Sequence, residues 1–176
     1  TWTRFSSDIF KGYAHKIKED LASKDLLFLG TEMGLYVSID GGANWVQMKG
    51  RIPEYCLVRD IVIEPRTNDL ILGTHGRGIL IVDDISPLRK INQQLLNSEV
   101  AVIPTKPAAV CNPHFGGSFG AAGEFVGSNS NEEAQIFYYL KNRVNSGTVK
   151  VEVFDSNGNF LVDLPGTKRK GINRIS

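Results

Sequence analysis

The most reactive side chains of this sequence lie in short clusters. In His75-Gly76-Arg77 an imidazole and a guanidinium are two residues apart, and such a pair could hold a carboxylate or a sugar hydroxyl. Asp83-Asp84 resembles a carboxylate pair, and glycoside hydrolysis needs two carboxyl groups facing one sugar. We favour a plainer interpretation of both: Gly76 sets a turn with solvated neighbours, and Asp84 caps a turn.

A second cluster, Ser38-Ile39-Asp40-Gly41-Gly42-Ala43-Asn44-Trp45, fits the Asp-box pattern S/T-x-D-x-G-x-x-W. The Ser38 hydroxyl and the Asp40 carboxylate can bond to backbone N–H groups of a tight turn. Gly42 permits a positive φ, and Trp45 can pack across the turn. We therefore predict a structural role for these four residues, with ligand or ion contact at Asp40 as the lesser alternative.

Composition argues against several other functions. Twenty Lys and Arg face nineteen Asp and Glu, the formal charge is +1, and no block of one sign occurs, which disfavours binding to nucleic acid or anionic membranes. Apolar stretches such as residues 78–82 are far shorter than the roughly 20 residues of a membrane helix. Cys56 and Cys111 are far apart and outside any metal-binding pattern, so we expect no metal and no cofactor and favour free thiols over a disulfide.

The elements that must position these residues are short strands. Helical spacing occurs only in residues 86–96, where four aliphatic residues could form a short amphipathic turn or helix. Elsewhere, β-branched and aromatic runs are separated by Gly, Pro, Asn and Asp, as is typical of strands. In the first half of the chain we predict strands over residues 15–20, 26–32, 34–39, 45–48, 59–64, 70–74 and 78–82.

These strands repeat along the chain. Leu27-Phe28-Leu29-Gly30-Thr31 lines up with Leu70-Ile71-Leu72-Gly73-Thr74, 43 residues later. After one inserted residue, residues 34–40 line up with residues 78–84 at a distance of 44. Trp2 and Trp45 are also 43 residues apart, and each opens a similar segment. Three separate landmarks therefore share one period.

A period of about 40 to 45 residues with four short strands is typical of a β-propeller blade. Residues 2–5 are then the outer strand of one blade, residues 15–48 a complete blade, and residues 59–84 three strands of another. The chain holds about one and a half to two four-stranded blades, fewer than the four to eight of a typical ring. We therefore expect a piece of a longer protein, or partner chains that close the ring.

The meander also predicts where a ligand would bind. The Asp-box turn joins the third and fourth strands at one end of a blade, so the turn between the second and third strands lies at the opposite end. Propeller ligands usually bind at that opposite end. The candidate ligand residues there are Glu32, His75 and Arg77, with Asp60 near the start of an inner strand.

The blade pattern stops after Asp84, and we predict three regions: terminal blades in residues 1–97, a linker rich in Pro and Gly in 98–123, and an incomplete β-sandwich in 124–176. The strands of the sandwich are expected over residues 134–140, 148–155, 160–164 and 171–175. Alternating valines in 149–153 indicate a half-buried strand. Asp155-Ser156-Asn157-Gly158-Asn159 predicts a hairpin turn. The fold class is thus all-β, a partial β-propeller followed by a partial Ig-like β-sandwich.

The sequence also resembles a known family. Three segments look like the last blades of BNR/Asp-box propellers, of the glycosyl-hydrolase-like or sortilin type, in secreted bacterial proteins: residues 29–42, 72–79 and 82–85. Three more look like the first strands of the Ig-like module that follows such propellers: residues 136–141, 151–155 and 171–175. The resemblance implies export to the periplasm or the cell surface.

Two functions remain open. The first is a binding or scaffold role, in which an extracytoplasmic propeller presents a surface to carbohydrate or protein. The alternative is part of a sialidase-like glycoside hydrolase whose active site lies mainly in other blades. Sialidases share the Asp box and use an arginine triad, but the spacing of Arg59, Arg66 and Arg77 identifies no triad. We therefore assign no catalytic residue and expect no catalysis from this chain alone.

Overall fold

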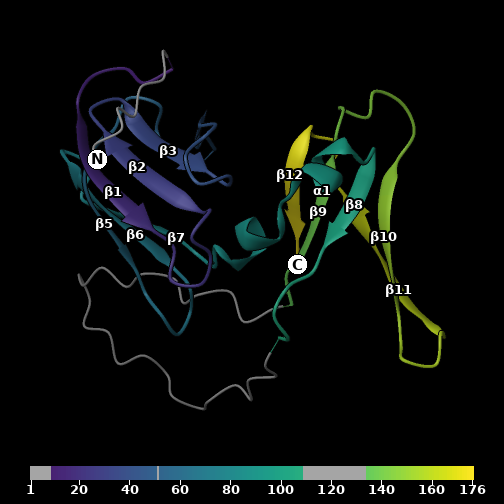
Figure 1. The fold of residues 1–176 in the computed structure, drawn as a ribbon. Helices are drawn as coiled ribbons and strands as arrows, with labels where there is room; N and C mark the ends of the chain where they lie inside the picture. The colour runs from purple at the N-terminus through teal and green to yellow at the C-terminus, as the bar shows by residue number, and fades with distance from the viewer. Residues whose placement is uncertain (1–8, 51, 109–133) are drawn as a thin grey trace, which may run out of the picture. The chain divides into compact units, whose positions relative to one another are not determined.

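The computed structural model describes residues 9–50, 52–108 and 134–176. In this part of the chain 44% of the residues are in strands and 7% in helices, and every strand pair is antiparallel. The predicted all-β class is confirmed. The chain divides into two compact units, 1–95 and 96–176, and Figure 1 shows the sheets of each.

The first sheet is a four-stranded antiparallel meander in the order β1-β2-β3-β4. Its strands are β1 (Ala14–Glu19), β2 (Leu27–Thr31), β3 (Gly34–Ser38) and β4 (Val46–Gln47). Two residues, Glu32 and Met33, turn the chain from β2 into β3, and the φ of +120° at Gly34 suits glycine alone. The predicted strands differ from these by one or two residues at their ends, which is the usual uncertainty of strand boundaries.

The second sheet repeats this meander with three strands, in the order β5-β6-β7. Its strands are β5 (Leu57–Ile63), β6 (Leu70–His75) and β7 (Ile79–Val82). After β7 the chain forms the 3₁₀ helix η1 (Ser86–Lys90), which has Pro87 in its first turn, and then α1 (Gln93–Asn97). The turn or helix expected over residues 86–96 is therefore formed by two short helices, because Ile91 takes an extended conformation between them.

Irregular features recur in both sheets at equivalent positions. The β1–β2 register skips His15, between the pairs Ala14–Thr31 and Lys16–Gly30. The β5–β6 register skips Arg59, between Val58–Thr74 and Asp60–Gly73. Each threonine closes the next turn through its hydroxyl, which donates to the Gly34 carbonyl at 3.0 Å in one sheet and to the Gly78 carbonyl at 2.6 Å in the other. The sequence repeat is thus also a repeat of bulges and turn contacts.

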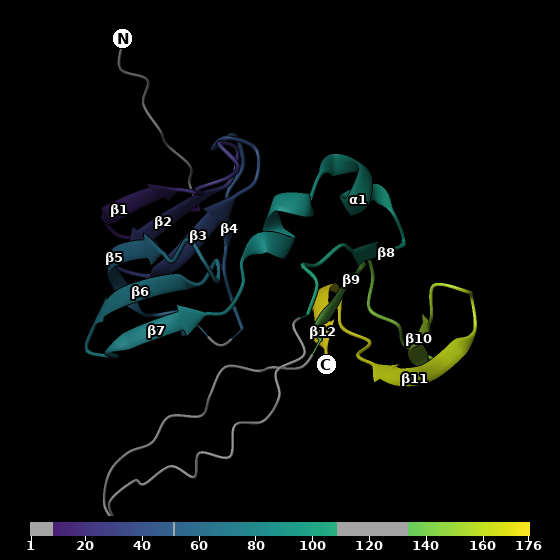
Figure 2. The same cartoon turned by 90° about the horizontal axis from the view of Figure 1, so that it is seen from below.

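The two sheets share one hydrophobic core, and Figure 2 shows them stacked. Its buried residues come from both sheets and adjoining loops: Leu26, Phe28, Leu35, Ile52, Val58, Ile61, Ile63, Leu70, Leu72 and Ile85. Gly30 lies at a close approach of β2 to β5, because a Cβ atom there would lie 2.8 Å from the Val58 carbonyl oxygen and 2.9 Å from its Cγ1. Glycine lets the two backbones approach to this distance.

The other face of the first sheet packs under residues 9 and 10. Leu29, Tyr36 and Trp45 form a second buried cluster with Phe10 against it. The Phe10 ring meets Tyr36 edge-on at 5.2 Å between centroids and Trp45 at 5.6 Å, which is a favourable aromatic geometry. The Tyr36 hydroxyl donates to the Ile9 carbonyl at 3.1 Å. Both faces of this sheet are therefore packed.

The second unit contains a three-stranded sheet in the order β12-β9-β8 and a two-stranded hairpin, β10-β11. The strands are β8 (Val100–Ile103), β9 (Ile136–Leu140), β10 (Val149–Phe154), β11 (Phe160–Gly166) and β12 (Gly171–Ile175). The alternation predicted for β10 is confirmed, since its valines are half-buried and its other residues exposed. The predicted hairpin turn is confirmed as well, with a φ of +82° at Gly158.

Part of the predicted linker 98–123 is a strand. β8 lies within it and pairs with β9 from Val100–Leu140 to Ile103–Phe137, so the linker prediction is wrong for residues 100–103. The predicted strand over residues 2–5 and Cys111 lie outside the described residues. Cys56 is a buried free thiol.

The close approach at Gly30 predicts that an added methyl group destabilises the fold at this position and not at the equivalent Gly73. The Gly30→Ala substitution forces the Val58 backbone to move, so we expect a loss of about 1–3 kcal/mol of unfolding free energy. Gly73→Ala is the matched control, because its Cβ would lie 3.5 Å from the nearest atom, Asp60 Cβ. Urea unfolding followed by tryptophan fluorescence measures both, since Trp45 is buried in this unit. Equal midpoints for the two variants would contradict the packing argument.

Candidate functional site

The Asp-box turn brings its four predicted residues together. The Ser38 hydroxyl donates to Asp40 Oδ1 at 2.8 Å and accepts the Gly42 N–H at 2.9 Å. The Trp45 indole N–H donates to the Gly42 carbonyl at 3.0 Å. Asn44, which the motif leaves unspecified, donates its backbone N–H to Asp40 Oδ1 at 2.8 Å and its side-chain amide to Oδ2 at 2.7 Å. Both carboxylate oxygens of Asp40 thus accept hydrogen bonds from residues of the turn.

Asp84 occupies the equivalent place in the second sheet. Its backbone has a φ of +44°, and its Oδ1 accepts the Ser86 N–H at 3.1 Å. One loop contact recurs: Gly41 N–H donates to the Asp25 carbonyl in the first sheet, and Ile85 N–H to the Asn68 carbonyl in the second, both at 2.9 Å. The geometry at Asp84 is that of a turn cap, and Asp83 is exposed beside it.

Two further carboxylates cap loops at this end of the sheets, and sequence reasoning missed both. Asp20 Oδ2 accepts the backbone N–H of Ala22 at 3.0 Å and of Ser23 at 2.9 Å. Glu64, 44 residues later, accepts the corresponding N–H groups of residues 66 and 67 at 2.8 and 2.7 Å through Oε2. The repeat distance was the signal that could have found this pair, because Asp20 and Glu64 each follow an inner strand.

An arginine joins each of these caps. Arg89 binds Asp20 with two bonds, Nε to Oδ2 at 2.8 Å and Nη2 to Oδ1 at 2.9 Å. Burial raises the pKa of Asp20, but the Arg89 bonds and the backbone N–H groups outweigh it and hold that pKa below its ordinary value. The Asp20 side chain has no exposed surface, so this ion pair is part of the interior.

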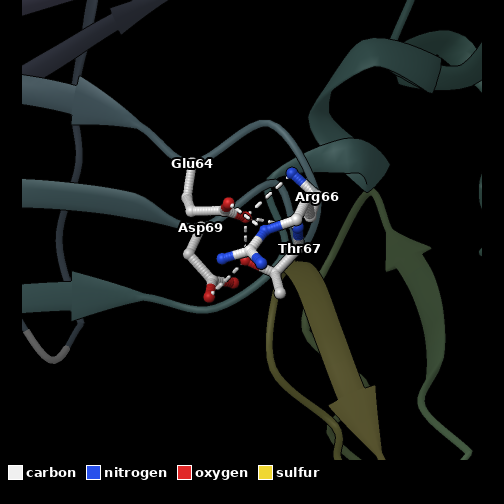
Figure 3. Close-up of polar contacts among 4 residues, drawn as sticks. All are labelled: Glu64, Arg66, Thr67 and Asp69. Carbon is white, nitrogen blue, oxygen red and sulfur yellow. Dashed lines mark hydrogen bonds and ion pairs between the residues drawn. The ribbon is translucent and has the colours of Figure 1, made fainter.

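Figure 3 shows the corresponding cap in the second sheet. Arg66 Nε donates to Glu64 Oε1 at 2.8 Å, and the Thr67 hydroxyl lies 2.9 Å from Glu64 Oε2 and 2.7 Å from Asp69 Oδ2. The Arg66 bond and the Thr67 N–H lower the pKa of Glu64 from 4.5 to about 2. Arg66 and Thr67 are exposed and Glu64 and Asp69 are half-buried. All four have partners within the loop, so we assign this cluster a structural role.

Three of the four predicted ligand residues, Glu32, His75 and Arg77, lie at the opposite end of the sheets, and Asp60 lies in the middle of β5. Glu32, in the β2–β3 turn, is half-buried and accepts the Tyr13 N–H through Oε2 at 3.1 Å. Asp60, next to the bulge in β5, pairs with Lys16 of β1 at 3.1 Å. The Lys16 ammonium lowers the pKa of Asp60. The two acids are therefore engaged separately, one by backbone and one by a lysine from the other sheet.

His75 and Arg77 lie in and beside the β6–β7 turn. The φ angles of +83° at Gly76 and +65° at Gly78 shape this turn. Both side chains are exposed, and neither forms a side-chain hydrogen bond with another residue that the structure describes. His75 pairs across the ladder with Leu57, the first residue of β5, whereas Asp60 lies in the middle of that strand, opposite Gly73. The His75 and Arg77 side chains are thus accessible to a ligand.

No group of three or more His, Cys, Asp or Glu that could hold a metal occurs in residues 9–50, 52–108 and 134–176. None of the helices described there is long and apolar enough to cross a membrane. The second unit has an open cavity of about 240 Å³ next to β10 and β11, lined in part by Lys150, Asp163 and Lys168. No predicted site residue lines it.

The low pKa of Glu64 predicts how acid affects stability. A carboxyl whose pKa is about 2 when folded and 4.5 ordinarily stabilises the fold above pH 4.5, and its contribution disappears as the pH falls towards about 2. We therefore expect Glu64→Gln to be less stable than the wild type near pH 7, with a difference that shrinks between about pH 5 and pH 2. Urea midpoints across this range measure it.

The control for this experiment is Glu19→Gln. Glu19 is an exposed carboxyl of the same unit, and it caps no loop. Its difference from the wild type is expected to stay small throughout. A Glu64→Gln difference that is the same near pH 7 and pH 2 would contradict the assignment of the cap.

Comparison with known proteins gives a limited likeness. No protein-family model matches the chain, and no solved structure matches it. A xyloglucanase from Paenibacillus sp. is 42% identical to it over 53 residues. These residues are 30% of this chain and 5% of the xyloglucanase, so the chain spans a small part of that protein. The chain is all-β, with a local similarity to a xyloglucanase.

Proposed function

We propose that this chain is part of an extracytoplasmic Asp-box β-propeller, followed by an Ig-like β-sandwich module, and that it acts as a binding scaffold. The observation that carries the proposal is the recurrence of one construction at a distance of 43–44 residues. The bulge opposite Gly30 and Gly73, the threonine turns, and the carboxylate caps all recur. A blade-type meander with these repeated parts is what a propeller requires.

The distribution of charged groups favours binding over catalysis. At the Asp-box end, the carboxylates of Asp20, Asp40 and Glu64 are used by backbone N–H groups. Glu32 at the opposite end and Asp60 in the middle of β5 have separate partners. A glycosidase needs one carboxyl that can give a proton and another that can attack or activate water. A lowered pKa and a lysine partner make Asp60 a poor proton donor at neutral pH.

The ligand class that we propose is carbohydrate, bound at the end that carries His75 and Arg77. Both side chains are exposed there, and a guanidinium can bond to two oxygens of a carboxylate or to sugar hydroxyls. The likeness to a xyloglucanase supports carbohydrate as a class. It also supports the second candidate, a piece of a glycoside hydrolase whose catalytic groups belong to other parts of the protein.

Calorimetric titration of the full chain with xyloglucan oligosaccharides and with acidic glycans tests the binding role. We expect binding to weaken about tenfold or more in Arg77→Ala, because a charged hydrogen bond contributes roughly 1.5–3 kcal/mol. His75→Ala is expected to act in the same direction. Arg143→Ala, an exposed arginine of the second unit, is the matched control and should bind as the wild type does.

Two outcomes would count against the scaffold role. Absence of binding to every glycan, or full binding by Arg77→Ala and His75→Ala, would contradict the assigned site. Release of reducing ends from xyloglucan would contradict the scaffold role and favour the hydrolase.

A further inference from the structure

The turn between β10 and β11 is held by one carboxylate. Asp155 Oδ1 accepts the backbone N–H of Asn157 at 2.8 Å and that of Asn159 at 2.8 Å. Asp155 Oδ2 accepts the side-chain amide of Asn159 at 2.8 Å. The Gly158 N–H donates to the Asp155 carbonyl at 3.1 Å, and the Asp155 N–H to the Asn159 carbonyl at 2.9 Å. The backbone of the turn is therefore fixed by bonds that all end on Asp155.

The Asp-box turn uses the same clamp between an aspartate and an asparagine four residues later. Asp40 Oδ1 accepts the backbone N–H of Asn44, and Oδ2 accepts its side-chain amide. The two turns differ in the residues that the clamp encloses. Residues 41–43 are Gly, Gly and Ala, whereas residues 156–158 are Ser, Asn and Gly. Of the two turns, the β10–β11 turn alone thus encloses a side-chain amide.

The enclosed amide of Asn157 is free to rotate. Asn157 is exposed, and its side chain forms no hydrogen bond with a residue that the structure describes. Gly158 follows it in the only Asn-Gly pair of the sequence and has a φ of +82°. The space beside Gly158 is open to 4 Å, measured from the place that a Cβ would occupy. No side chain therefore shields the Gly158 nitrogen from the Asn157 amide.

We propose that Asn157 deamidates spontaneously in the folded protein and that the product loosens the β10–β11 turn. The Gly158 nitrogen loses its proton and attacks Asn157 Cγ, so an N–Cγ bond forms and the Cγ–Nδ2 bond breaks. Nδ2 takes up a proton and leaves as ammonia, and a five-membered succinimide remains. Water from the solvent then opens the ring. Opening at Cγ gives aspartate, and opening at the main-chain carbonyl gives isoaspartate, whose backbone runs through Cβ and Cγ.

Asp40-Gly41 in the Asp-box turn shows how the fold protects a similar pair. An aspartate before a glycine can form the same ring, with water as the leaving group. Asp40 is held in place, however, because both of its carboxylate oxygens accept hydrogen bonds from Ser38 or Asn44. Rotation of its carboxyl towards the Gly41 nitrogen would break these bonds. The Asn157 amide has no such bonds to break, so the two turns should age differently.

The product disturbs the turn in two ways. Bonds from Asn159 hold the pKa of Asp155 below its ordinary value, so a new carboxylate at residue 157 lies beside a charged one at neutral pH. Isoaspartate also adds a backbone atom between Asp155 and Asn159, which displaces the donors that Asp155 binds. β10 and β11 pair only with each other in the described sheets, and a two-stranded hairpin has little stability of its own. We therefore expect the Phe154–Phe160 ring contact, at 5.9 Å beside the turn, to be lost.

Ageing of the full chain at neutral pH and physiological temperature, followed by digestion at mildly acidic pH and mass spectrometry, tests this inference. We expect Asn157 to deamidate at least about tenfold faster than Asn145, an exposed asparagine of the same unit that precedes Ser146. The rate should rise with pH, because the Gly158 nitrogen must lose its proton. Isoaspartyl methyltransferase should label the aged wild type but not Asn157→Gln, whose longer side chain forms a six-membered ring far more slowly.

Hydrogen exchange measures the effect on the turn. The amides of β10 and β11 should exchange faster in the aged wild type, and those of β8, β9 and β12 should not change. Asn157→Asp has the new charge without the added backbone atom, so we expect a smaller effect in this variant.

Three results would overturn the inference: Asn157 reacts no faster than Asn145, it reacts only in urea, or the aged β10–β11 hairpin exchanges as the fresh one does. Asn157 belongs to the second unit, and His75 and Arg77 belong to the first. The deamidation and the proposed glycan binding can therefore fail separately.

Discussion

The first unit depends on the contact between the β2 backbone and β5, at Gly30 and Val58. A side chain at residue 30 would push the sheets apart, and the aliphatic groups between them would lose their close packing. The Lys16–Asp60 pair crosses the same junction, but its side chains are 45% and 58% exposed, and an ion pair in water adds little. Packing therefore determines how the sheets meet, and the ion pair contributes little to the stability of the contact.

The repeated strands could be predicted because their causes are local. Apolar runs before Gly30 and Gly73 predict β2 and β6, and the Asp-box residues fold among themselves. The bulges at His15 and Arg59 could not be predicted in this way, since a bulge depends on the register of a partner strand. The Arg89 partner of Asp20 is 69 residues away, and no short sequence window contains that bond.

The second unit shows the same division between local and distant causes. The turn at Gly158 is local and was predicted, whereas β8 becomes a strand only because β9 pairs with it from more than 30 residues away. β11 also continues through Pro165, although proline ends most strands. The proline is tolerated because β11 pairs only with β10 in the described sheet. One edge of β11 therefore has no partner strand, and proline, which has no backbone N–H, is found on such edge strands. In the candidate site, the Asp-box geometry could be predicted from the sequence. The bonds that Glu32 and Asp60 form with Tyr13 and Lys16 could not, because these partners are distant in the sequence.

The ion pair between Asp20 and Arg89 has a consequence for how the unit opens. It joins the loop after the first strand to the 3₁₀ helix that follows the last, so one interior bond spans nearly all of the repeat region. Releasing β7 and η1 alone would leave a buried carboxylate without its counter-charge, which costs more than fraying an ordinary chain end. The first strand and the last helical turn are therefore protected by one another, and we expect them to open together in hydrogen exchange and not one at a time.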